Sequence, residues 1–105
     1  MSPIDLLSAR LYAFRDARNW RQFHTGENLA KSVSIEAAEL LEIFQWGTDY
    51  KKISKKRIAE ETADVFIYLL QLANLSGFDL IQAAHDKIDA NEKKYPAGKW
   101  RGRAR

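Results

Sequence analysis

The segment from Val65 to Leu72 constrains the fold most. It is apolar almost all round and lies in a periodic stretch that we expect to be helical from about Lys56 to Ser76, with Gly77 as the C-cap. A surface helix of a small monomer cannot bury every side of such a segment against its own chain, and 105 residues provide only a modest core. The segment therefore predicts a packed interface between subunits.

Three further helices are predicted from capping residues and apolar periodicity. The first begins at 2–5, where a serine followed three residues later by an aspartate can form a capping box; the second is expected at about 27–44 and the last at 79–96. The polar segment 48–56 is expected to be a loop. No strand pattern competes, so we predict an all-α fold of the four-helix bundle type.

The composition limits the chemistry and the location. The chain has no cysteine, which removes disulfides and thiolate metal sites, so any metal must be held by oxygen or by the two histidines. Hard cations are therefore favoured. No apolar run approaches the ~20 residues of a membrane span, and the N-terminal residues lack a signal pattern. We expect a cytoplasmic protein with no membrane partner.

The formal charge of +3 is concentrated at the C-terminus. Lys99, Arg101, Arg103 and Arg105 lie within the last seven residues, and the rest of the chain is nearly neutral. We expect a single domain over residues 1–96 and a basic, flexible tail over residues 97–105. A phosphate-attracting arm is the alternative interpretation of this tail.

Four acidic residues occupy positions where apolar residues are expected. At about 100° per residue, Glu36 falls on the edge of the apolar stripe of its helix, and Glu39 lies one turn away. In the segment that contains Val65, Asp64 falls inside the apolar stripe and Glu61 lies beside it one turn earlier. Two helices therefore each direct an acid-x-x-acid pair toward the core.

Unpaired carboxylates in an apolar bundle cost several kcal/mol per ion, so these acids must be protonated, paired or bound to metal. Magnesium prefers oxygen ligands and commonly bridges carboxylates to phosphates. The spacing is also compatible with solvated faces in which the acids pair with Lys55, Lys56 and Arg57, although Asp64 fits that interpretation worst. A di-iron bundle is disfavoured because its Glu-x-x-His motifs are absent here.

Several motifs together resemble a known family. They are Trp20-Arg21-Gln22-Phe23-His24, Asn28-Leu29, Ser34-Ile35, Glu36-Ala37-Ala38-Glu39-Leu40, Phe44-Gln45-Trp46, Glu60-Glu61-Thr62-Ala63-Asp64, Val65-Phe66-Ile67-Tyr68-Leu69-Leu70 and Asn91-Glu92-Lys93-Lys94-Tyr95-Pro96. In this order and at these separations they resemble the MazG-like nucleotide pyrophosphohydrolases, and among them the dCTP pyrophosphatase branch. The resemblance covers nearly all of the chain except its tail.

The resemblance implies a set of site residues and an assembly. It implies magnesium ligands at Glu36, Glu39, Glu61 and Asp64, with manganese as a possible substitute. It implies base or sugar contacts at His24, Trp46 and Tyr68, and phosphate-side contacts at Lys87, Asn91, Lys94 and Tyr95. It further implies a homo-oligomer in which two subunits build each site, arranged as a tetramer that is a dimer of dimers.

The activity implied is magnesium-dependent hydrolysis of a nucleoside triphosphate to its monophosphate and pyrophosphate. A dCTP-like or modified deoxynucleotide is the expected substrate, and removal of such nucleotides from the pool is the expected role. We expect the attack of a water on the α-phosphorus, with Glu39 as the proton acceptor. The alternatives are a non-catalytic bundle that binds nucleic acid through the basic tail, which the inward acids disfavour, and an antitoxin-like partner protein.

Overall fold

The structure is a computed structural model that describes residues 1–47 and 49–104. Four helices of 15 to 22 residues account for most of the chain, and the described residues include no strand. They are α1 (Pro3–Ala17), α2 (Gly26–Glu42), α3 (Lys55–Ser76) and α4 (Leu80–Lys94). Short helical turns follow at η1 (Arg21–Phe23), η2 (Tyr50–Lys52) and α5 (Ala97–Trp100). The all-α class predicted from the sequence is confirmed.

The helices begin and end where local capping chemistry places them. Ser2 and Asp5 form the capping box predicted for α1, and the Asp79 side chain accepts a hydrogen bond from the Gln82 backbone N–H at the start of α4. The α3 helix ends at Gly77, whose φ of 82° lies in the left-handed region that favours glycine. The predicted start of α1 and both predicted bounds of α2, α3 and α4 are therefore confirmed to within two residues.

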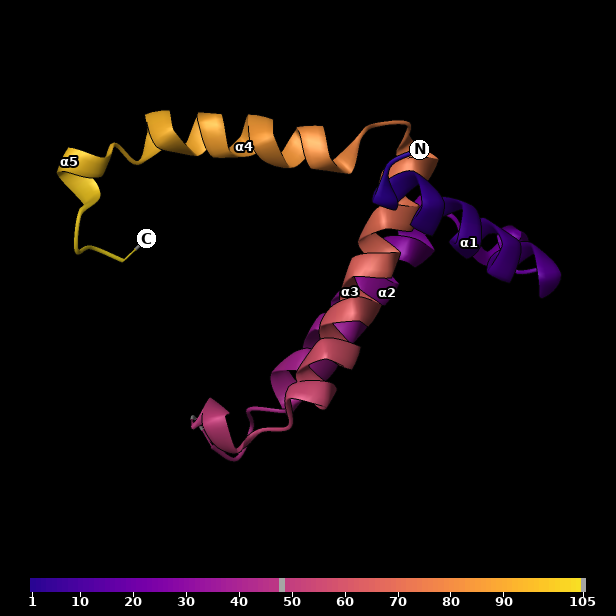
Figure 1. The fold of residues 1–105 in the computed structure, drawn as a ribbon, viewed down its shortest axis with the longest axis horizontal. Coiled ribbons are helices and arrows are strands. Elements are labelled where there is room, and N and C mark those ends of the chain that lie inside the picture. The colour runs from indigo at the N-terminus through magenta and orange to yellow at the C-terminus, as the bar shows by residue number, and fades with distance from the viewer. Residues whose placement is uncertain (48, 105) are drawn as a thin grey trace.

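The core is formed by α2, α3 and α1. Helices α2 and α3 run side by side as a hairpin, and α1 packs across α3 (Figure 1). Of the described residues, only Leu29, Leu70 and Ala73 are fully buried. A core of this size leaves much of the apolar surface of the chain uncovered.

Helix α4 does not join this core. It leaves α3 at a bend of 96° and extends away from the α2–α3 hairpin, on the side opposite α1 (Figure 1). The radius of gyration is 16.9 Å, whereas about 13 Å is expected for a compact domain of this length. The four predicted helices therefore exist, but a single chain does not close the predicted four-helix bundle. Among the described residues, α4 does not pack extensively against α1, α2 or α3.

Two segments differ from the sequence-based expectations. The predicted loop at 48–56 includes the helical turn η2, and the predicted tail begins with α5. The α5 turn is held against the end of α4 by an edge-to-face contact between Tyr95 and Trp100, whose ring centroids lie 5.1 Å apart. Arg105 lies outside the described residues.

Length and apolar composition decide which of the described helices are candidates to span a membrane. No single helix among them is long and apolar enough to cross a bilayer, and α3 and α4 meet the length and composition criteria only as a pair bent by 96°.

Candidate functional site

Three acidic side chains meet where α2 faces α3. Glu36 and Glu39 lie one turn apart on α2, and Glu61 lies on α3. Each offers a carboxylate oxygen, and these oxygens all lie within 4.8 Å of one another. We call these three residues the acid cluster. The structure thus brings together three of the four acids that the sequence singled out.

Asp64 lies beside the acid cluster rather than in it. It is half-buried on α3, one turn after Glu61. It does not belong to the group of acids whose carboxylate oxygens all lie within 4.8 Å of one another. Its charge nevertheless contributes to raising the pKa values of Glu36 and Tyr68. Asp64 is therefore an electrostatic neighbour of the cluster, and its role as a direct ligand stays a prediction.

The acid cluster lacks protein cations. Among the described residues, none of its three acids forms an ion pair, and Glu36 Oε2 and Glu61 Oε2 are buried without a hydrogen-bond partner. The pairing with lysine that the sequence left open occurs instead at Glu60, whose Oε1 lies 3.9 Å from Lys56 Nζ on the exposed side of α3. The cluster therefore carries negative charge that nothing described in the chain neutralises.

Burial and the neighbouring acids raise the pKa of Glu36. Burial is the largest cause, followed by a hydrogen bond and charge repulsion from Glu39 and by the charges of Asp64 and Glu61; together they raise the pKa of Glu36 to about 7. Without a cation, the cluster holds a proton near neutral pH. A divalent cation could replace that proton, because it supplies the positive charge that the site lacks.

The predicted contacts to the base and sugar lie in two different places. His24 and Tyr68 line one small cavity of about 60 Å³ with Trp20 and Gln71. Burial, together with the charges of Glu36, Asp64 and Glu39, raises the pKa of Tyr68, so the Tyr68 side chain lies within electrostatic reach of these acids. Trp46 lies beyond the end of α2 and is 90% exposed, so this chain does not bring it to that cavity.

Trp20 and Gln71 line this cavity although the sequence predicts no role for them. Trp20 is held by the ring of Phe14, with centroids 5.8 Å apart, and lies near the Arg18 guanidinium. The sequence signal for Trp20 is its place in the segment Trp20-Arg21-Gln22-Phe23-His24, one of those that carry the family resemblance. Gln71 carries no local signal, because its position in the cavity depends on how α1 crosses α3.

The predicted phosphate-side residues are not brought to the acids within one chain. Lys87, Asn91 and Lys94 belong to α4, which points away from the α2–α3 hairpin (Figure 1). Tyr95, directly after α4, has the Lys94 Nζ atom 5.4 Å from its ring centroid and the Trp100 ring against its edge. One chain does not bring these residues to the acid cluster, because the bend after Gly77 carries α4 away. The expectation that two subunits build each site stays a prediction.

Known proteins are similar to this chain in sequence. The sequence profile of the MazG-like family matches residues 31–104. The chain is 39% identical over 103 residues to mouse dCTP pyrophosphatase 1 and 40% identical over 96 residues to the human protein, covering 90% and 84% of this chain. It spans only 61% and 56% of the lengths of these two relatives.

A solved structure shares the fold. A pyrophosphatase from Archaeoglobus fulgidus superposes with a TM-score of 0.85 at 43% sequence identity, and the match covers 91% of this chain and 94% of that one. Because the match covers 91% of this chain, it includes residues of the projecting α4 as well as the α2–α3 hairpin.

Proposed function

The chain belongs to the MazG-like family, and on that premise we propose that it hydrolyses a nucleoside triphosphate to the monophosphate and pyrophosphate. The observation that carries the proposal is the acid cluster, with three carboxylates from two helices and two buried oxygens without partners. The names of the relatives, dCTP pyrophosphatase and pyrophosphatase, point to the same class of reaction.

The residues of the cluster fit a divalent cation of the magnesium type. All of the donors are carboxylate oxygens, two of which are buried and unpartnered, and hard cations prefer such oxygen ligands. We propose Glu36, Glu39 and Glu61 as ligands, with Asp64 beside them, and manganese as a possible substitute. When bound, such an ion lowers the pKa of a water and neutralises charge on phosphate oxygens.

Other roles in the proposed reaction belong to side chains of this chain. Glu39 is the exposed member of the cluster and is the acid we propose to accept a proton from the attacking water. We propose that Tyr68 and His24 contact the sugar and base from their shared cavity, where Trp20 adds an aromatic face. Trp46 is a further candidate for a base contact.

The phosphate-side residues reach a site only if a second copy supplies them. We propose that Lys87, Asn91, Lys94 and Tyr95 of one subunit complete the site of another, in a homo-oligomer built as a dimer of dimers. The projecting α4 supports this arrangement, because it leaves Ile81 and Ile88 46% and 56% exposed. Exposed apolar side chains on an unpartnered helix are favourable only when another surface covers them.

The substrate that we propose is dCTP or a modified deoxynucleotide of similar shape, and the role is removal of such nucleotides from the cellular pool. Support comes from the names of the mouse and human relatives. A cytoplasmic location and a domain boundary near residue 96 stay predictions.

One experiment tests the proposed function. The full-length chain is incubated with a panel of canonical and modified triphosphates, with and without magnesium, and the products are separated. We expect magnesium-dependent release of pyrophosphate and the monophosphate, with dCTP or a close analogue among the best substrates. Release of orthophosphate would place the attack on another phosphorus, and the absence of hydrolysis combined with salt-sensitive nucleic-acid binding would favour the non-catalytic alternative.

A further inference from the structure

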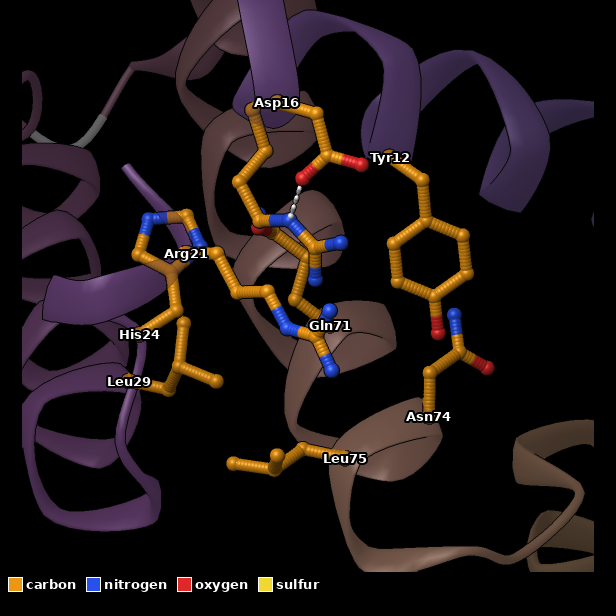
Figure 2. Close-up of a pocket in the computed structure, with 9 residues that line it drawn as sticks. Tyr12, Asp16, Arg21, His24, Leu29, Gln71, Asn74 and Leu75 are labelled. Carbon is orange, nitrogen blue, oxygen red and sulfur yellow. Dashed lines mark hydrogen bonds and ion pairs between the residues drawn. The ribbon is translucent and has the colours of Figure 1, made fainter. Parts of the chain in front are cut away.

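A second polar cleft lies apart from the acid cluster. Its volume is about 500 Å³, and it is enclosed by the C-terminal half of α1, η1, the first turn of α2 and the last turns of α3 (Figure 2). None of the four predicted acid ligands lines it, but His24 and Gln71 line both this cleft and the small cavity near Tyr68. It is therefore a neighbouring space with a different chemical character.

Two arginines give the cleft its positive charge. Arg15 is largely buried, with 16% of its side chain exposed, and its Nε atom donates to Asp16 Oδ1 at 2.8 Å. The Arg21 side chain extends across the middle of the cleft, and its guanidinium forms no hydrogen bond with any residue that the structure describes (Figure 2). Two cations thus face one carboxylate, and the N–H donors of Arg21 have no protein acceptor.

His24 does not change this balance of charge. Burial and the Arg15 charge lower the pKa of His24 below its ordinary value of 6.5, so the imidazole is neutral at pH 7. Its Nδ1 atom is buried and has no hydrogen-bond partner. The lining of the cleft therefore carries a net charge of about +1 at neutral pH.

The wall formed by α3 offers acceptors. The Gln71 side-chain amide donates to the Ile67 carbonyl at 3.2 Å, and the Asn74 amide donates to Ser8 Oγ at 3.0 Å. These bonds fix both amide groups, and no donor within residues 1–47 and 49–104 bonds to their side-chain oxygens. Partly buried polar groups of this kind are stabilised when a polar ligand or water satisfies them.

We propose that this cleft binds the phosphate group of a small molecule, with Arg21 as its principal partner and Arg15 as the second. A guanidinium presents parallel N–H donors that match two phosphate oxygens, which is why arginine is preferred at such sites. The phosphate comes either from free phosphate or from a nucleoside monophosphate, whose base can donate to Gln71 and Asn74. The proposal does not depend on the proposed hydrolysis, because its residues lie outside the acid cluster.

The test is a titration of the metal-free full-length chain with inorganic phosphate, followed by the backbone amide NMR signals of Asn74 and Leu75, which line the cleft but not the small cavity. Without metal, the negative acid cluster repels phosphate, so a response reports on the cleft. Arg21→Gln removes the charge at an exposed position, and Arg10→Gln makes the same change of charge on α1 outside the cleft. We expect saturable phosphate binding in the wild-type protein. Arg21→Gln should weaken this binding about tenfold, because it removes one charge-assisted hydrogen bond.

Arg10→Gln should leave the binding unchanged, and Arg21→Lys should restore part of it. Equal weakening by Arg10→Gln and Arg21→Gln, unaltered binding by Arg21→Gln, or no saturable response would each overturn the proposal. Parallel titrations with dCMP and deoxycytidine identify the source of the phosphate. Tighter binding of dCMP than of inorganic phosphate supports a nucleotide, equal binding supports free phosphate, and deoxycytidine binding as tightly as dCMP contradicts the proposal.

Discussion

Replacing Glu36 by Gln should stabilise the metal-free protein at alkaline pH and change it little at acid pH. Burial and the neighbouring acids raise the pKa of Glu36 from 4.5 to about 7 in the folded state. The folded protein therefore binds more protons than the unfolded chain between these values, so the free energy of unfolding falls as the pH rises from about 4.5 to 7. Above pH 7 the full cost of the charged form is present.

The size of this effect follows from the pKa. Raising it from 4.5 to about 7 corresponds to at most about 3.4 kcal/mol, at about 1.4 kcal/mol per pH unit. The Glu36 side chain is partly exposed, so solvent screening reduces the expected cost to about 1–2 kcal/mol. Glu36→Gln keeps the shape of the side chain and removes the charge, so it should recover about this amount at pH 8 and nearly nothing near pH 4.

The assay is urea unfolding followed by circular dichroism, with EDTA and one protein concentration throughout, because assembly would otherwise shift the apparent stability. Glu42→Gln is the matched control, since Glu42 is an exposed residue of the same helix. His24 has a lowered pKa and makes stability rise with pH only up to about 6.5, so comparing variants at each pH removes its contribution.

Magnesium provides a second comparison for the same variants. At pH 8 it should stabilise the wild-type protein more than Glu36→Gln, because the variant lacks one of the proposed ligands. The reasoning is refuted if the two proteins have the same pH dependence, or if Glu42→Gln reproduces the effect of Glu36→Gln.

Three further predictions concern other parts of the molecule. Asp64→Asn should lower kcat for triphosphate hydrolysis by about 10–100-fold or more with unchanged helicity, because Asp64 acts electrostatically on Glu36; a near-normal kcat measured by pyrophosphate release would contradict its role. Gly77→Ala should lower the free energy of unfolding by about 1–2 kcal/mol in urea titrations, since its φ is 82°, and no loss would contradict the strain argument. Ile88→Glu should reduce the assembly mass measured by light scattering, whereas Lys93→Glu on the same helix should not; an unchanged mass for both would remove α4 from the subunit interface.

Local chemistry explains which parts of the fold were predictable from the sequence. The capping box at Ser2 and Asp5, the cap at Asp79 and the left-handed turn at Gly77 depend on residues only a few positions apart, so the helix bounds follow from the sequence. The direction of α4 could not be predicted in this way. Apolar periodicity shows which face of a helix needs cover, but it does not show whether the same chain provides it.

The same distinction applies to the candidate sites. Spacing by one helical turn placed Glu36 and Glu39 together, and the apolar stripes of α2 and α3 brought Glu61 to face them. The cleft around Arg21 was not predicted, because it depends on the crossing of α1 over α3 and on the turn η1. No periodic sequence pattern indicates the helix crossing or the turn, so the sequence does not show which distant residues they bring together.

The central claim is that Glu36, Glu39 and Glu61 hold a divalent cation. It is tested most directly by locating manganese through its anomalous X-ray scattering in crystals of the full-length protein. The account predicts a peak within bonding distance of carboxylate oxygens from all three residues. A peak elsewhere, with the three side chains directed away from one another, would contradict it.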